Sequence, residues 1–326
     1  MLLVACFSPM TSFAFVDEQT TDSGAGMFGY RLGKIVYQLN NMNNNNNGWD
    51  IVIRPHKKWL DLDLKGVWKY RDLFKQFVKR DIVTIYKQTI FGPLWFFFQP
   101  IFTTVMYMFV FANLAGISTG SIPPALFYMS GTLLWNYFTA CFTTGQFAFS
   151  GNAGIFSKVY FPRLVAPLSG ITSGFLKVIV QSIPLVAIWL YYCFDETVGI
   201  SLTWEFCLVP FFFVILALTG LGCGLIVSTL TVKYRDLNNL VSFFLQLWMY
   251  STPVIYPVDV TADRNLSRFL YMNPLQGVFT DFRYMITGIG EMDWWSLLYS
   301  VVFMAVIMFL GILLFSKQER TFMDTI

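Results

Sequence analysis

Long apolar runs constrain this chain more than any other feature of its sequence. Six of them follow one another after residue 90, and each approaches the roughly 20 residues that a helix needs to cross a hydrocarbon core. They are Leu94–Leu114, Ile122–Phe149, Leu164–Phe194, Leu202–Val232, Leu240–Tyr256 and Trp294–Phe315. Inside lipid a single segment satisfies its own backbone hydrogen bonds only as a helix. The sequence therefore predicts an all-α membrane protein with six transmembrane helices.

The composition agrees with this prediction and argues against several other classes of protein. Charged residues make up 13% of the chain and the mean hydropathy is +0.56, whereas soluble domains carry about 25% charged residues. The net charge of +3 is too small to indicate nucleic-acid binding. His56 is the single histidine, and the five cysteines lack the paired spacing of a zinc site. We expect neither a metal site nor a histidine-based catalytic site.

Three regions are predicted along the chain. Residues 1–50 include an asparagine tract and are expected to be a disordered extension or to precede the true start, for which Met42 is one alternative. Residues 51–90 contain basic and apolar side chains at helical spacing between Trp59 and Gln88, which predicts an amphipathic helix in the headgroup plane. Residues 91–326 form the six-helix transmembrane domain.

The lysines and arginines between the apolar runs predict the orientation of the chain. The region before the first run is rich in both, and Lys158 with Arg163, and Lys233 with Arg235, mark the second and fourth connections. The first connection, Ala115–Ser121, has no charge. By the positive-inside rule, both termini and the two basic connections face the cytoplasm.

The connection before the last span has a different character. Pro257–Asp293 should be external, yet it contains a moderately apolar stretch, Phe269–Ile286. Asn273, Pro274 and Arg283 interrupt this stretch, so it cannot span the bilayer. Non-helical backbone at such a depth is tolerated only where protein or water surrounds it. A re-entrant or gate-like helical hairpin is therefore predicted before the last span.

Five short strings carry a family resemblance that covers nearly everything from residue 59 to the C-terminus. They are KRDIVTIYKQTIFGPLWFFFQP (Lys79–Pro100), FSKVYFPRLVAPLS (Phe156–Ser169), KYRDLNN (Lys233–Asn239), TPVIYP (Thr252–Pro257) and NPLQGVFTDFR (Asn273–Arg283). In this order, on a plan of six spans, they resemble the permease subunits of type 2 ABC exporters. Within that class they are most similar to permeases for O-antigen, capsule-type polysaccharide or teichoic acid.

The resemblance implies a set of partners. Two copies of the permease pair with two copies of a separate P-loop ATPase in the cytoplasmic (inner) membrane, and the substrate is a lipid-linked glycan. ATP and magnesium are expected on the ATPase and no cofactor on this chain, whose sequence contains no GxxxxGK[ST] motif. The resemblance also implies an external gate before the last span, with Asn273, Pro274 and Arg283 as its candidate residues.

A dense group of aromatic and basic side chains in the second connection is the candidate for coupling to the ATPase. The resemblance implies that this segment couples to the ATPase, and a segment that must seat in a cleft of a soluble motor needs a compact aromatic knob with polar flanks. An ordinary positive-inside loop with interfacial aromatics explains the charges but not the density of aromatic side chains. The candidates are Phe156, Lys158, Tyr160, Phe161, Pro162 and Arg163, together with Lys233, Tyr234, Arg235 and Asp236 of the fourth connection.

Aromatic residues of the first two spans are candidates for a substrate pathway. Sugar polymers present C–H faces on which rings stack, although aromatic residues are also common where helices face lipid. The candidates are Trp95, Phe97, Tyr107, Trp135, Tyr137 and Phe138.

Lys177 lies near the middle of the third apolar run, with Gln181 one turn further on. A charge at the bilayer centre costs at least about 2.5–3.5 kcal/mol, so this lysine is expected to face protein or water. Contact with a phosphate or an acidic sugar of the substrate is one interpretation, and pairing or snorkelling within the bundle is the other.

Two other function classes have partial support in the sequence. An ATP-independent channel or carrier fits the composition, but no inverted repeat is evident. A membrane glycosyl or acyl transferase needs an acid/base or metal constellation, and the external connection supplies only Asp259, Asp263, Asp281 and Glu291, without a DxD pair. The sequence therefore favours a transport subunit over an enzyme.

Overall fold

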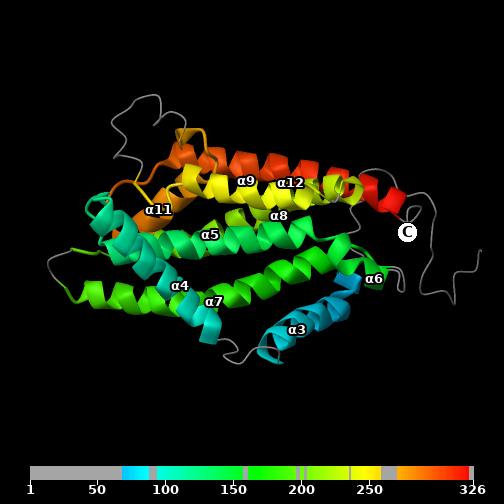
Figure 1. The fold of residues 1–326 in the computed structure, drawn as a ribbon, viewed down its shortest axis with the longest axis horizontal. Coiled ribbons are helices and arrows are strands. Elements are labelled where there is room, and N and C mark those ends of the chain that lie inside the picture. The colour runs from blue at the N-terminus through cyan, green and yellow to red at the C-terminus, as the bar shows by residue number, and fades with distance from the viewer. Residues whose placement is uncertain are drawn as a thin grey trace, which may run out of the picture. The chain divides into compact units, whose positions relative to one another are not determined.

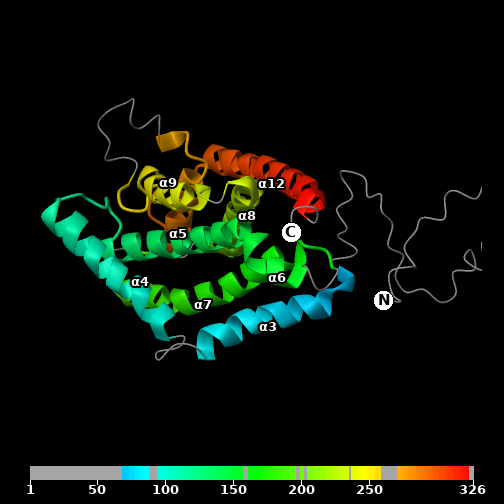
Figure 2. The same cartoon turned by 45° about the vertical axis from the view of Figure 1, so that its right-hand side comes forward.

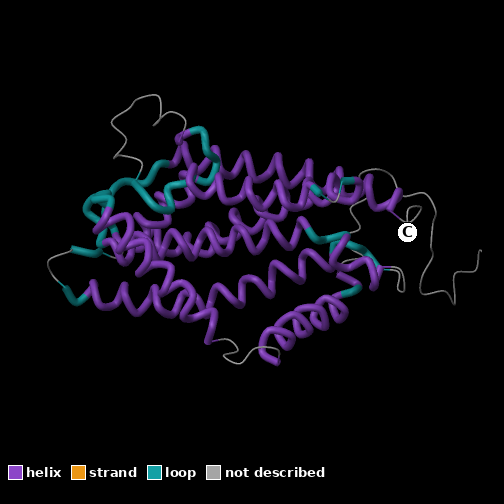
Figure 3. Tube along the Cα trace, viewed as in Figure 1, coloured by secondary structure: helices purple, strands orange, loops and turns teal. Residues whose placement is uncertain are grey.

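The computed structural model describes residues 68–87, 94–156, 161–195, 199–201, 204–234, 236–257 and 270–322. All regular structure within these ranges is helical (Figures 1 and 3). The long helices are α3 (Arg71–Lys87), α4 (Leu94–Tyr107), α5 (Pro124–Gln146), α7 (Val165–Cys193), α8 (Val209–Lys233), α9 (Leu237–Ser251), α11 (Gln276–Thr287) and α12 (Trp294–Phe322). The extension 1–50 and the part of the expected amphipathic helix before residue 68 lie outside the described residues.

Four stretches of the described chain are long and apolar enough to cross a membrane. They are Leu94–Leu114, Val165–Cys193, Trp204–Val232 and Trp294–Gln318. The other two predicted spans correspond to α5, which has 23 residues, and α9, which has 15. At 1.5 Å per residue α9 is roughly 22 Å long, shorter than a hydrocarbon core of about 30 Å. The all-α membrane fold is confirmed, and the count of six spans stays a prediction.

The connections alternate between two ends of the bundle (Figures 1 and 2). The short helix α6 (Ala153–Phe156), the connection from α8 to α9 and the C-terminal end of α12 lie at one end, which we call the α6 end. The turn between α4 and α5 and the helix α11 lie at the other end, which we call the α11 end. Both connections that carry the basic residues therefore lie at the same end.

Helix α8 lies at the centre of the bundle, packed most extensively against α5 and α12. Glycines make this approach possible: a Cβ on Gly220 would lie 2.8 Å from the carbonyl oxygen of Phe138 on α5, and one on Gly222 would lie 2.9 Å from the backbone of Met308 on α12. Small residues that let helix backbones come close are the usual device of membrane bundles. The glycine-rich stretch of α8 is thus a packing surface.

The first span changes its helical geometry along its length. Pro100 lies inside α4, and after Tyr107 the chain continues as a seven-residue π-helix, η1 (Met108–Leu114). Most side chains of this span are exposed, including Phe102 and Phe109. A helix with so little burial inside one protomer needs lipid or another protein against its remaining surface.

Candidate functional site

Aromatic side chains of three elements meet at the α6 end. The centre of the Phe161 ring, just before α7, lies 5.7 Å from the centre of the Phe77 ring of α3 and 5.5 Å from that of Phe156 of α6. Phe149 stacks on Phe315 of α12 at 4.3 Å in the same cluster. The amphipathic helix, the second connection and the last helix are therefore joined through one aromatic core.

Some of the predicted coupling residues are buried in this aromatic core, and others are exposed. Phe156, Phe161 and Arg163 are buried, and the Arg163 guanidinium lies 5.6 Å from the centre of the Phe156 ring. Tyr234, which is 56% exposed, and Asp236 lie open at the start of α9. The buried rings of Phe156 and Phe161 stabilise the α6 end, whereas Tyr234 and Asp236 are exposed and can contact another protein. Of the remaining candidates, Pro162 is partly exposed, the side chain of Lys233 is not described, and Lys158, Tyr160 and Arg235 lie outside the described residues.

Lys177 of α7 lies where two adjoining cavities meet. One, of about 480 Å³, is bounded by α4, α5 and α7, and the other, of about 420 Å³, by α3, α5 and the start of α7. We call the two together the α7 cavity. Lys177 is half-buried, and its ammonium lies 5.6 Å from the centre of the Phe96 ring, a cation–π contact. The expectation that this charge faces protein or water agrees with its position.

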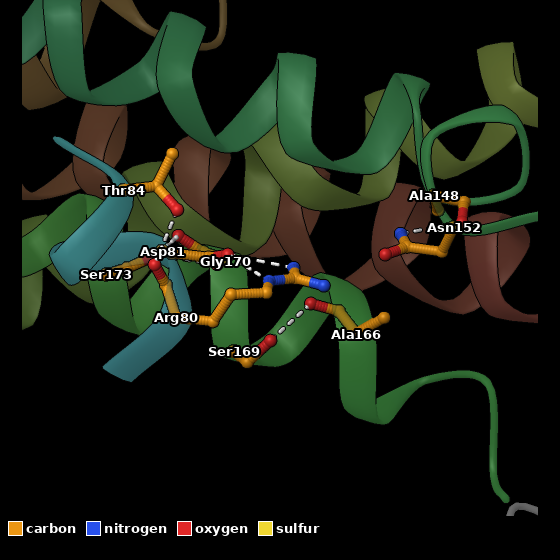
Figure 4. A network of polar contacts seen from close by, with 9 residues as sticks. All are labelled: Arg80, Asp81, Thr84, Ala148, Asn152, Ala166, Ser169, Gly170 and Ser173. Carbon is orange, nitrogen blue, oxygen red and sulfur yellow. Dashed lines mark hydrogen bonds and ion pairs between the residues drawn. The ribbon is translucent and has the colours of Figure 1, made fainter. Parts of the chain in front are cut away.

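A small polar network closes the α3 side of this cavity (Figure 4). Asp81 of α3 is paired with the neighbouring Arg80 at 2.8 Å and accepts a 3.4 Å hydrogen bond from the Ser173 hydroxyl of α7. The Asp81 carboxylate also attracts the Lys177 ammonium electrostatically. The amphipathic helix thus contributes one cation and one anion to the cavity, and Lys177 leaves the group of three with a net positive charge.

The predicted pathway residues separate into two groups. Tyr137, Lys177 and Gln181 line the α7 cavity. Trp135 and Phe138 are buried in the core of the protomer, where Phe138 packs 5.2 Å from Trp248 of α9. On the first span, Trp95 is exposed, Phe97 is partly exposed, and Tyr107 packs against Phe111 and Tyr128.

Several polar residues of the α7 cavity escaped the sequence analysis. Ser173, Lys177 and Gln181 are spaced by four residues and so share one face of α7, which was a readable signal. Asp81 gave no such signal, because nothing in the basic string around it shows that it meets α7. The remaining uncharged polar members are Thr84, Gln99, Asn136, Thr139, Thr143, Thr144 and Asn152.

Asn273 ties the hairpin at the α11 end to the end of α9. Its amide nitrogen donates to the carbonyl oxygen of Ser251 and to the hydroxyl of Thr252, both at 2.9 Å. Its amide oxygen accepts from the indole of Trp248 at 3.2 Å and from the backbone of Leu275 at 3.1 Å. The carbonyl of the next residue, Pro274, accepts from the Ser300 hydroxyl of α12 at 2.6 Å. The turn before α11 is therefore anchored on α9 and α12, and the first arm of the predicted hairpin lies outside the described residues.

Arg283 of α11 is buried, with 3% of its surface exposed. Its Nη2 donates to the carbonyl oxygens of Phe127 at 3.3 Å and Val254 at 3.2 Å, and its guanidinium lies 3.6 Å from the centre of the Phe127 ring. Gly131 leaves room for it, since a Cβ there would lie 2.7 Å from Nη2. This arginine joins α5, the turn after α9 and α11.

Asp281 of α11 is also buried, with 1% of its surface exposed. Its Oδ1 accepts a 3.2 Å hydrogen bond from the backbone of Asp293, which in turn accepts hydrogen bonds from the first turn of α12. Burial raises the pKa of the Asp281 carboxyl from 3.8 to about 7, and the nearby charge of Asp293 adds to the rise. Near neutral pH this group is therefore close to its titration midpoint.

The described residues offer binding surfaces and no recognisable catalytic centre. Among them, no three His, Cys, Asp or Glu side chains come together as metal ligands. The chain belongs to the ABC-2 type transporter family, whose model matches residues 72–287. This membership confirms the prediction of the permease subunit of a type 2 ABC transporter, which works with a separate ATPase and is not itself an enzyme.

Curated relatives extend this comparison. Two proteins of Klebsiella pneumoniae, both named O-antigen export system permease protein RfbA, are each 28% identical to this chain over 254 residues, which is 78% of this chain and 94% of the relative. A protein of the same name from Myxococcus xanthus is 28% identical over 222 residues, 68% of this chain and 82% of the relative.

Proposed function

We propose that this chain exports an O-antigen-like polysaccharide on a lipid carrier across the inner membrane, as a homodimer bound to two copies of the separate ATPase. One observation carries the proposal: the similarity to O-antigen export permeases extends over 94% of the length of two relatives. The exposed side of the first span is a surface that a second copy can cover. The α6 end faces the cytoplasm, together with both termini, because both basic connections lie there.

Contact with the ATPase falls on the exposed part of the α6 end. Tyr234 and Asp236 supply open side chains, and the buried rings of Phe156 and Phe161 carry a displacement from the second connection to α3 and α12. A packed aromatic core transmits such a displacement because it does not deform continuously.

The α7 cavity is the proposed contact for an anionic group of the substrate, either the phosphate of the carrier or an acidic sugar. Lys177 and Arg80 supply positive charge, and the threonine and serine hydroxyls supply donors. Leu176 and Ile179 are exposed on α7 beside Lys177. An apolar chain can lie on them while the anion reaches the lysine.

Co-purification tests the proposed function directly. The affinity-tagged chain, extracted from membranes with its neighbouring gene products expressed, is expected to bring down a P-loop ATPase in equal amounts and to support export of a surface glycan. A chain that exports without any ATPase is a channel or carrier. A chain that modifies a lipid-linked sugar in the absence of the ATPase is a transferase. Either result contradicts the proposal.

Lys177→Gln tests the α7 cavity, with Lys75→Gln as a matched control. Lys75 is an exposed lysine of α3, paired only with Asp72 at 3.8 Å among the ion pairs of the described chain. Export by Lys177→Gln should fall about tenfold, equivalent to the loss of one charge-assisted hydrogen bond of about 1.4 kcal/mol. ATPase co-purification should be unchanged in both variants. Equal export by both excludes a role for Lys177 in substrate contact.

A further inference from the structure

One face of α3 contacts both the aromatic core of the α6 end and the α7 cavity. Phe77 belongs to the core, where the centre of its ring lies 5.7 Å from the centre of the Phe161 ring. Asp81, one turn further along α3, borders the α7 cavity (Figure 4). Residues four apart lie on the same side of a helix. A single rigid element therefore joins the proposed ATPase contact to the proposed anion contact.

The contact between Asp81 and α7 can open at low cost. Oδ2 of Asp81 accepts a 3.4 Å hydrogen bond from the Ser173 hydroxyl, and the same hydroxyl reaches the carbonyl oxygen of Gly170, on its own helix, at 3.0 Å. Oδ1 accepts two hydrogen bonds from Arg80 of α3, at 3.0 and 2.8 Å. If α3 moves away from α7, Ser173 keeps its bond to Gly170 and Asp81 keeps those from Arg80. Neither side chain is left unsatisfied, which is the costly event when polar groups separate.

The charges make this contact sensitive to an anion. Lys177 lies one turn after Ser173 on α7 and lines the same cavity as Asp81. The Asp81 side chain is 26% exposed, so water and salt screen its attraction to the lysine less than that of a surface pair. A phosphate or a carboxylate that enters the cavity competes with Asp81 for Lys177 and Arg80. Its binding therefore weakens the attraction that holds α3 to α7 at this point.

We infer that Asp81 is the positioning residue that couples the α7 cavity to the ATPase contact. Before substrate binds, Asp81 holds α3 against α7, and an anionic group of the substrate then displaces it from Lys177 and releases α3. The movement passes from Phe77 to Phe161, because a packed aromatic core does not deform continuously. This inference rests on the proposed function and adds regulation to it: binding of the substrate anion increases the rate of ATP hydrolysis.

Thermodynamic linkage gives this coupling a signature. If the anion displaces Asp81, removal of the Asp81 charge strengthens binding of the anion by the same factor. The removal also releases α3 in the absence of substrate. A variant without this charge should therefore bind the anion more tightly and yet no longer respond to it. A residue that only stabilises the fold does not produce this combination.

ATP hydrolysis by the complex of this chain with its ATPase, in nanodiscs of phosphatidylcholine, tests the coupling. The probes are a short-chain polyprenyl phosphate and methyl glucuronide, which separate the phosphate of the carrier from an acidic sugar as the source of the anion. A polyprenol of the same length is the uncharged control. The wild-type rate should rise about twofold or more with at least one anionic probe and stay unchanged with the polyprenol.

Four variants locate the effect. Asp81→Asn should hydrolyse ATP at the raised rate without any probe, show no further rise, and bind the anionic probe about threefold more tightly than the wild type. Asp81→Glu retains the charge and should restore most of the response. Phe77→Leu keeps Asp81 and should bind the probe as the wild type does, with a weaker response. Asp72→Asn, on the exposed face of α3, is the matched control and should behave as the wild type.

Three results overturn the inference: an equal response of the wild type and Asp81→Asn, weaker binding of the probe by Asp81→Asn, or a wild-type rate that neither anionic probe raises above the polyprenol control. If Asp81→Asn does not assemble with the ATPase, Phe77→Leu decides, because a response equal to that of the wild type excludes transmission through α3. If ATPase co-purification and export by the wild type remain intact, the proposed function stands and only this inference fails.

Discussion

The α7 cavity and the α11 end treat their charges in opposite ways. Around Lys177 the charged groups are half-exposed, lie beside an open cavity and neutralise one another in part, as Arg80 and Asp81 do. At the α11 end Asp281 and Arg283 are buried and form no ion pair with each other, and backbone carbonyls hold the guanidinium. A partly hydrated charge can exchange partners at low cost, whereas a buried one fixes the groups around it. The comparison indicates an adaptable contact in the α7 cavity and a rigid α11 at the other site.

The largest contrast is expected from two asparagines. Asn273→Ala removes three hydrogen bonds to the end of α9 and one from the backbone of Leu275, and should lower the unfolding free energy by about 3 kcal/mol. Asn152→Ala at the α6 end removes one bond, to the carbonyl of Ala148, and should cost about 1 kcal/mol. Thermal unfolding in detergent measures both. Similar losses from the two variants would break the comparison.

Two glycines give the next contrast. Gly131→Ala places a methyl group 2.7 Å from Nη2 of Arg283 and 2.9 Å from the carbonyl oxygen of Val254, neither of which can move freely, and should destabilise the chain by about 1–3 kcal/mol. Gly170→Ala meets the side chain of Thr144, which borders the α7 cavity and has space to rotate. That variant should cost less than about 1 kcal/mol. The melting temperatures of the two proteins check the order.

The pH dependence of stability sharpens the comparison at the α11 end. The pKa of Asp281 is raised from 3.8 to about 7 by burial, so between these values the folded chain binds a proton that the unfolded chain has lost. Stability contributed by this group is therefore present at low pH and falls as the pH rises toward 7. The melting temperature should drop by a few degrees between pH 5 and pH 8, and Asp281→Asn should flatten this part of the profile. A slope that persists in Asp281→Asn would assign it to another group.

The smallest effect is expected from Asp81→Asn. The change weakens the ion pair with Arg80 and a long hydrogen bond from Ser173, both partly exposed, and should alter the unfolding free energy by less than about 1 kcal/mol. Removal of the Asp81 charge also leaves Lys177 more positive toward an anion. Titration of the purified chain with a short-chain polyprenyl phosphate should then show tighter binding, and weaker binding would place Asp81 itself in contact with the ligand.

Sequence by itself determined the membrane class, the helical fold and the family. Apolar runs of spanning length predict helices, because a backbone surrounded by lipid must satisfy its own hydrogen bonds. The basic and apolar pattern of α3 predicts a helix that lies in the headgroup plane. The break before α11 was also predictable, because Asn273 and Pro274 interrupt an otherwise apolar stretch, whereas the first arm of the predicted hairpin lies outside the described residues. Ser173, Lys177 and Gln181 could have been grouped from their spacing alone.

Tertiary structure decided which of these residues face one another. Phe156 and Phe161 were candidates for the aromatic knob that couples to the ATPase, and the structure buries both in a core shared with α3, where no local pattern shows that an amphipathic helix packs. Trp135 and Phe138 have the same aromatic character as Tyr137, yet only Tyr137 reaches the α7 cavity, because neighbouring positions on a helix point in different directions. The surroundings of Arg283 likewise depend on residues far away in the chain, Phe127 and Val254, whose carbonyl oxygens accept its hydrogen bonds. Local sequence determines what a helix is, and packing determines what each of its faces meets.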